Sequence, residues 1–80
     1  MKIPRNISAR ELIKSLGKIG YEVTRQKGSH IRLTYNFPNE HHVTIPNHDP
    51  IKIGTLSAIL TDIAKIRNQS KEDLLSQLFG

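Results

Sequence analysis

The sequence predicts an α+β fold in the order helix, three strands and two further helices. Near both ends of the chain, apolar residues recur at intervals of three and four, which is the spacing of one helix face. In the middle, apolar and polar residues alternate, as they do in half-buried strands. Short turn segments separate these alternating runs, and short connections favour hairpin pairing. We therefore expect a three-stranded antiparallel sheet with the first and second helices on one face.

The first helix is predicted from Ser8 onward by local signals. Ser8 is a preferred N-cap residue, and Glu11, three residues later, completes a capping box. Ile7 and Leu12 occupy the two positions of a hydrophobic staple. The apolar stripe of this helix is Leu12, Ile13 and Leu16, and two glycines favour its end, Gly17 and Gly20.

A cationic row follows the other side of this helix. Arg10, Lys14 and Lys18 are spaced four residues apart, so their side chains share one face. Like charges at this spacing cost about 0.2–0.5 kcal/mol per pair, a cost that a phosphate backbone would reverse. The row is therefore either a nucleic-acid contact or a solvated outer face.

Three strands are predicted, at residues 21–27, 30–35 and 42–45. Gly28-Ser29 joins the first two as a tight turn, because glycine accepts the positive φ of such turns. Residues 36–40, which include Pro38 and Asn39, form the next loop. One face of the sheet carries apolar side chains: Ile31, Leu33, Tyr35, Val43 and Ile45. The other carries polar ones for water or a partner: His30, Arg32, Thr34, His42 and Thr44.

Two helices complete the chain after a loop at residues 46–50, whose two prolines stop the third strand. The second helix begins between Ile53 and Thr55, and Asn68-Gln69 ends it. Its apolar side is Leu56, Ile59, Leu60, Ile63 and Ile66. A short third helix has a Ser70 cap, Asp73 in its first turn and an apolar side of Leu74, Leu75 and Leu78. Residues 1–80 are thus one domain, with a core at about 7–66 and a C-terminal helix at about 70–79.

Composition limits the class of protein. A chain of 80 residues buries roughly 60% of its unfolded surface, which allows one small core. Cysteine is absent, so the chain has neither disulfides nor thiolate metal sites, and a reducing compartment is the default. The N-terminus lacks the apolar run of a signal peptide, and no stretch approaches transmembrane length. We expect a cytoplasmic protein that does not associate with membranes.

Positive charge is concentrated in the first half. Residues 1–35 hold eight of the twelve basic residues and two acids, a net charge of +6, whereas residues 36–80 have a net charge of −1. This asymmetry indicates an anionic partner for the first half, most often a nucleic acid, or else a surface that only aids solubility.

Gly28-Ser29-His30 is the most informative motif because basic residues flank it. Arg25 and Lys27 precede it and Arg32 follows it. Strand alternation puts Arg32 on the same face as the histidine, and Gln26 or Lys27 approaches that face across the hairpin. The motif therefore predicts an imidazole in a positive field.

Such an imidazole suits RNA cleavage. Neutral imidazole accepts protons near pH 7, and neighbouring cations favour the neutral form. His30 would deprotonate the 2′-OH beside the scissile phosphate, and the cations would stabilise the added charge. Ser29 either contacts phosphate or only shapes the turn, and Gly28 permits the turn and a close backbone approach. The alternative is an exposed turn histidine without chemistry.

Other site chemistries find little support. His41 and His42 are adjacent in a strand and point opposite ways, so they are poorly placed to chelate one metal ion. No nucleophile elbow accompanies Ser29, so a hydrolase triad is not indicated. We therefore expect no metal site and no cofactor.

Three segments together resemble the HicA toxin family of toxin–antitoxin systems. They are residues 8–16 with Gly20-Tyr21, residues 25–31 with the Gly-Ser-His box, and residues 44–48 followed by Gly54-Thr55-Leu56 and Ile59-Leu60. The resemblance spans about residues 7–66. Each segment is weak alone, but the three in this order and at these spacings are fairly specific.

The resemblance implies a fold like a double-stranded-RNA-binding domain and a type II toxin that cleaves mRNA without metal. It implies an antitoxin partner of the HicB type, and we expect the toxin alone to be monomeric. His30 would be catalytic. The RNA-binding residues would be Arg25, Lys27, Gly28, Ser29, Arg32, Lys14 and Lys18.

The acid that protonates the leaving 5′-oxygen stays open. His48 matches a family position, and His42 shares the polar sheet face; either is the acid, a phosphate contact or a surface histidine, and water is a further candidate. Two rival functions also stay open: a non-catalytic module that binds double-stranded RNA, and a domain that docks an acidic protein.

Overall fold

A computed structural model describes residues 2–36 and 39–80 of the chain. Its elements follow the predicted order: α1 (Ala9–Gly17), β1 (Glu22–Lys27), β2 (His30–Tyr35), β3 (His41–Pro46), α2 (Ile53–Ile66) and α3 (Lys71–Phe79). The strands form one antiparallel sheet in the order β1-β2-β3. The predicted α+β class is therefore confirmed. Pro38, assigned to the loop before β3, lies outside the described residues.

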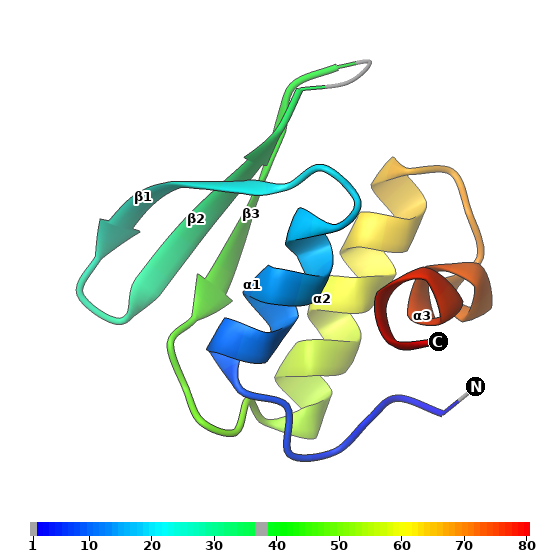
Figure 1. The fold of residues 1–80 in the computed structure, drawn as a ribbon, viewed down its shortest axis with the longest axis horizontal. Helices are drawn as coiled ribbons and strands as arrows, with labels where there is room; N and C mark the ends of the chain where they lie inside the picture. Colours follow the sequence, from blue (N-terminus) through cyan, green and yellow to red (C-terminus); the bar gives the residue numbers. More distant parts are fainter. Residues whose placement is uncertain (1, 37–38) are drawn as a thin grey trace.

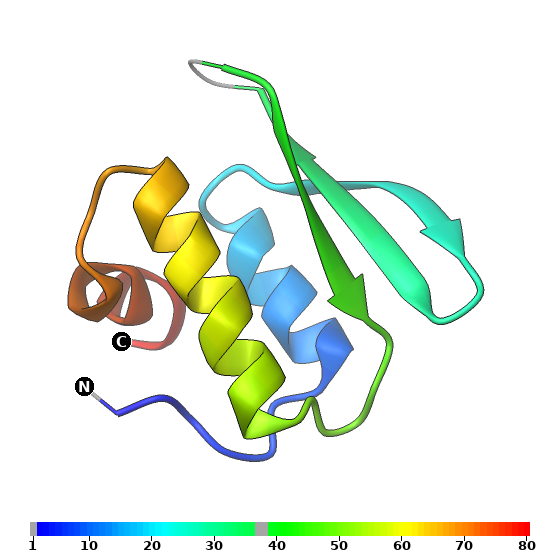
Figure 2. The ribbon, with the colours of Figure 1, turned by 180° about the vertical axis from the view of Figure 1, so that it is seen from behind.

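The elements form layers (Figures 1 and 2). Helices α1 and α2 lie side by side against one face of the sheet, and α3 packs against both of them away from the sheet. Every layer contributes fully buried side chains: Leu12 and Leu16 from α1, Leu33 and Ile45 from the sheet, Leu56, Leu60 and Ile63 from α2, and Leu74 and Leu78 from α3. Burying this apolar surface is the main force that holds the layers together.

The predicted helix caps are present. The Glu11 amide donates to the Ser8 hydroxyl at 3.1 Å, and the Ser8 amide donates to the Glu11 carboxylate at 3.2 Å. Ser70 caps α3 by accepting from the Asp73 amide at 3.0 Å. These local bonds satisfy amides that have no partner within their helices.

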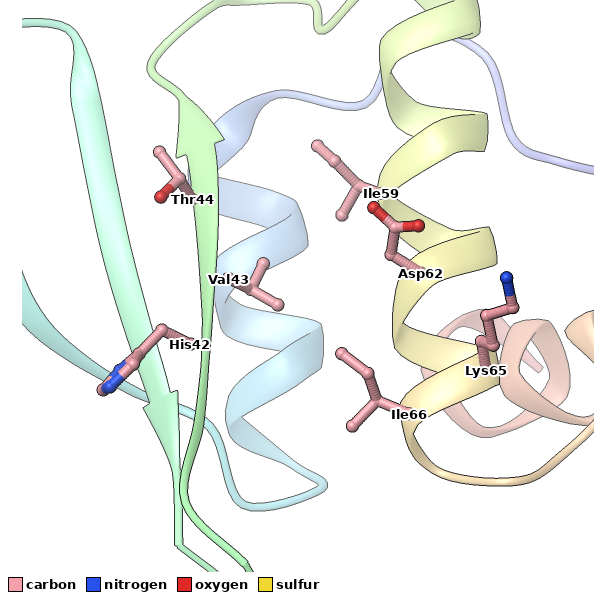
Figure 3. Close-up of a pocket in the computed structure, with 7 residues that line it drawn as sticks. All are labelled: His42, Val43, Thr44, Ile59, Asp62, Lys65 and Ile66. Carbon is pink, nitrogen blue, oxygen red and sulfur yellow. The ribbon is translucent and has the colours of Figure 1, made fainter.

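The opposite face of the sheet is covered by no described element, and we call it the open face. Cross-strand register and side-chain alternation assign its charged and polar residues: Glu22, Arg25 and Lys27 from β1, His30, Arg32 and Thr34 from β2, and His42 and Thr44 from β3. In Figure 3, His42 and Thr44 point away from α2, whereas Val43 points toward it. The predicted polar and apolar faces are therefore both present.

Three details of the prediction are wrong. Strand β1 begins at Glu22 rather than Tyr21, because the Tyr21 amide donates to the Leu16 carbonyl at the end of α1, at 3.1 Å, instead of to a neighbouring strand. Strand β3 runs from His41 to Pro46, because its pairing with β2 continues over the full length of both strands. The apolar stripe of the second helix places Ile66 in the core, but its side chain is 50% exposed and borders a hollow of about 250 Å³ between β3 and α2 (Figure 3).

A β-bulge in β1 has no counterpart in the prediction. The register with β2 shifts between Val23 and Arg25, so Thr24 is an additional residue without its own partner. A bulge bends its strand and redirects side chains. Here the Thr24 hydroxyl reaches the Thr34 hydroxyl on the open face, at 2.7 Å.

Candidate active site

The β1–β2 turn consists of the two residues Gly28 and Ser29, and it connects the register partners Lys27 and His30. Gly28 has φ +57°, in the left-handed region that glycine enters without a steric penalty. A Cβ at this position would meet nothing within 4 Å, so the constraint lies in the backbone alone. The predicted two-residue turn is therefore the observed one.

The loop after β3 is held against this turn. The Asn47 amide donates to the Ser29 carbonyl at 2.7 Å, and the Ala9 amide at the start of α1 donates to the His48 carbonyl at 2.9 Å. Pro46 is the register partner of His30 on the other side of β2. The turn, the loop and the beginning of α1 consequently meet at one end of the sheet.

His30 is exposed at this end, on the open face. Its neighbour across the hairpin is Lys27, and the next pair on the same face is Arg25 opposite Arg32. Like charges directly opposite each other destabilise a sheet. Among the described residues, no carboxylate lies within ion-pair distance of these three cations. At this end of the open face, His30 therefore lies beside positive charges that no carboxylate of the described residues neutralises. Such a surface favours binding of an anion.

The structure decides between Gln26 and Lys27. Gln26 pairs with Ile31 on the helix side of the sheet and lines a hollow of about 370 Å³ with Arg10, Ile13 and Asn47. The expectation that Gln26 could approach His30 is therefore wrong, and Lys27 is the residue that faces it. The two-residue turn makes Lys27 the register partner of His30. Because side chains alternate along a strand, Gln26 then points to the other face.

The two candidate acids lie at different places. His48 is exposed and follows Asn47, whose amide bonds the turn that carries His30. His42 pairs with Thr34, four residues along β2 from His30, which corresponds to about 13 Å at strand spacing. The structure thus brings the His48 loop to the turn and leaves His42 well away from it.

The α1 cations are separate from the open face. Lys14 and Lys18 are exposed on the outward side of a helix that packs on the sheet's other face. The structure does not bring them to His30. Arg10, the first residue of the row, instead borders the hollow beside Asn47. Arg10 lies near the turn because of the way α1 packs against the sheet. The four-residue spacing of the cationic row does not predict this position.

A closed aromatic cluster occupies the other end of the sheet, formed by Tyr21, Tyr35 and His41 with Arg67. The Tyr21 hydroxyl lies 2.7 Å from His41 Nε2, and the two tyrosine rings are 5.0 Å apart. Arg67 lies over the Tyr35 ring at 5.3 Å. Burial raises the pKa of Tyr21, and the nearby Arg67 guanidinium partly opposes this. His41 and His42 point to opposite faces as predicted, and His41 serves packing.

Within residues 2–36 and 39–80 there is no group of three or more His, Cys, Asp or Glu side chains placed to hold a metal ion. The same described residues include no helix with the length and apolar character needed to cross a bilayer.

Comparison with known proteins identifies the family. The model of the family described as HicA toxin of bacterial toxin–antitoxin systems matches residues 9–64. The chain belongs to the HicA toxin family. The match runs from the start of α1 to within α2 and includes the turn, the open face and the His48 loop. No curated protein and no solved structure matched the chain. Membership in this family makes the chain a toxin-type component with an antitoxin as its counterpart.

Proposed function

We propose that this HicA-family protein is an endoribonuclease that cleaves mRNA with His30 as the general base and without metal or cofactor. The observation that carries the proposal is the exposed His30 beside Lys27 and the Arg25–Arg32 pair, with no carboxylate in ion-pair reach among the described residues. A phosphate would neutralise these cations and lie next to a proton acceptor.

The reaction is an internal transfer. His30 takes the proton of a ribose 2′-OH, the 2′-oxygen attacks the adjacent phosphorus, and the bond from phosphorus to the 5′-oxygen breaks. Lys27 and Arg32 stabilise the charge that develops on the phosphate oxygens. The products are a 2′,3′-cyclic phosphate and a free 5′-hydroxyl.

His48 is the proposed acid for the leaving 5′-oxygen. Its loop is bonded to the turn through Asn47, whereas His42 is about 13 Å along the sheet from His30. Protonated imidazole would donate to the departing oxygen, and water would do so more slowly. His48→Ala should therefore retain partial cleavage, in contrast to His30→Ala.

We propose partners that fit this chemistry and are consistent with the family. The substrate is mRNA in the cytoplasm, contacted by Arg25, Lys27, Arg32 and the turn residues Gly28 and Ser29. The antitoxin is of the HicB type and inhibits by covering the open face at His30. Lys14 and Lys18 would contact RNA only where the strand continues around the β1 edge toward α1.

The decisive experiment incubates purified protein with end-labelled mRNA in EDTA. We expect fragments that end in 2′,3′-cyclic phosphate, and no cutting at a nucleotide whose ribose lacks the 2′-OH. Fragments produced equally well at 2′-deoxy positions would overturn the mechanism. Retardation of RNA without any fragments would instead indicate the non-catalytic double-stranded-RNA-binding module, and binding to neither would favour the protein-docking domain.

A further inference from the structure

A chain of side-chain hydrogen bonds crosses the open face at some distance from the turn. The Thr24 and Thr34 hydroxyl oxygens are 2.7 Å apart, and the Thr34 hydroxyl lies 2.8 Å from His42 Nδ1. We call these three residues the Thr–Thr–His ladder; each strand contributes one. Thr34 is 6% exposed although it lies on the polar face, because its two neighbours cover it.

The ladder holds one imidazole in a defined orientation. His42 Nδ1 is bonded to Thr34, while Nε2 makes no hydrogen bond to any described residue. A Glu40 carboxylate oxygen lies 4.0 Å from Nε2, which is beyond hydrogen-bond distance, and Glu22 is on the same face as the register partner of Thr34. The His42 side chain is 37% exposed. Its Nε2 is thus accessible to a ligand on the open face.

The ladder lies in line with the candidate active site. His30, Arg32 and Thr34 are successive residues on one face of β2, so Arg32 stands between the catalytic turn and the ladder. The bulge in β1 brings Thr24 to the ladder and leaves Arg25 opposite Arg32. Along β2, His30 and Thr34, the register partner of His42, are about 13 Å apart, so one phosphate cannot contact both histidines.

We propose that His42, positioned by Thr34 and Thr24, is a second RNA-contact site that binds a backbone phosphate of the same single strand that is cleaved at His30. This inference rests on the proposed ribonuclease function and names the path of its substrate along β2. In this proposal the Thr34 hydroxyl donates to Nδ1, so that Nε2 carries a hydrogen and donates it to the phosphate, and Arg32 contacts the segment between the two sites. Glu40 opposes binding through its negative charge, and its side chain, 66% exposed, yields to the phosphate.

The test measures binding to an RNA that cannot be cleaved, made with 2′-deoxyribose at the scissile nucleotide. His42→Ala should weaken binding about ten-fold, the value of one hydrogen bond to a charged group. Thr34→Val should weaken binding by a smaller factor, because it removes the hydrogen bond that orients the His42 ring but leaves the ring in place. Thr34→Ser keeps the hydroxyl and should bind this RNA as tightly as the wild type. Glu40→Gln should tighten binding. Thr44→Ala, on the same face without a ladder bond, is the matched control.

A second measurement separates this inference from the proposed function. A dinucleotide substrate occupies only the His30 end, so His42→Ala should cleave it at the wild-type rate while showing a raised KM for long RNA. If wild-type protein cleaves neither substrate, the ribonuclease function fails, yet the binding series still tests the ladder. If wild-type protein cleaves both and His42→Ala binds long RNA as tightly as Thr44→Ala, the ladder is only structural and the second site is refuted.

Discussion

The two ends of the sheet differ in the way their polar side chains are satisfied. At the turn end, His30, Lys27 and the Arg25–Arg32 pair face solvent with like charges opposed. At the other end, Tyr21 and His41 bond each other, and Arg67 lies over Tyr35. Side chains at one end of the sheet therefore stabilise the fold by contacting each other, whereas those at the turn end remain exposed and accessible to a ligand.

Adjacent histidines show the same division on a smaller scale. His41 points to the helix side and is joined to a buried tyrosine, whereas His42 points to the open face and is joined to Thr34. Their sequence environment is nearly identical. The face of the strand therefore decides whether a histidine packs or remains available for binding.

Substitution at the turn end should have the largest effect, and on activity alone. We expect His30→Ala to lower the rate of mRNA cleavage by about 100-fold or more, because a positioned general base contributes at least that factor. Since His30 is exposed, the thermal midpoint should stay near that of the wild type. Cleavage assays with thermal melts of the same samples check both. Cleavage by the variant at the wild-type rate would refute a catalytic role for His30.

Substitution at the end of the sheet that holds the Tyr21, Tyr35 and His41 cluster (the closed end) should instead lower stability. Gly20 has φ +104°, and a Cβ there would lie 2.7 Å from Cε1 of Tyr35. Gly20→Ala should cost about 2–3 kcal/mol, combining backbone strain with the displaced ring. Gly28→Ala is the matched control, because its φ is also positive but its Cβ would meet no atom within 4 Å. It should cost about 1–2 kcal/mol. Urea unfolding should rank the two; equal costs would show that Tyr35 moves freely.

The Tyr21 hydroxyl gives the closed end a pH dependence. The folded-state pKa is raised by burial, so above the ordinary value of 10.0 the unfolded chain loses this proton first. The contribution of Tyr21 to the free energy of unfolding should consequently be constant below pH 10.0 and should fall as the pH rises further. Tyr21→Phe should cost about 1 kcal/mol at neutral pH, from the lost bond to His41, and should flatten the alkaline decline. A decline of unchanged steepness in the variant would assign it to other groups.

The smallest effect concerns the opposed arginines. Arg32→Gln should raise the free energy of unfolding by about 0.2–1 kcal/mol, because it relieves repulsion from Arg25. The same change should weaken RNA binding and make it less dependent on salt, as expected for a lost phosphate contact. Chemical unfolding and binding at two salt concentrations measure the pair of effects. A loss of stability would mean that Arg32 is a structural residue.

The sequence by itself determined the order of the elements, both helix caps, the two-residue turn and the strand face that carries His30. These features depend on residues a few positions apart, through periodicity, capping bonds and backbone preference, so they are present in the pattern before any packing occurs.

Only the tertiary structure decided which of these pieces meet. The bond from Asn47 to Ser29, the choice of Lys27 over Gln26, the bulge at Thr24 and the separation of His42 from His30 all depend on strand register and on how a loop docks. Register is a long-range property, since a shift of one residue turns every side chain to the other face. The residues of the candidate site could therefore be named from the sequence, whereas their grouping could not.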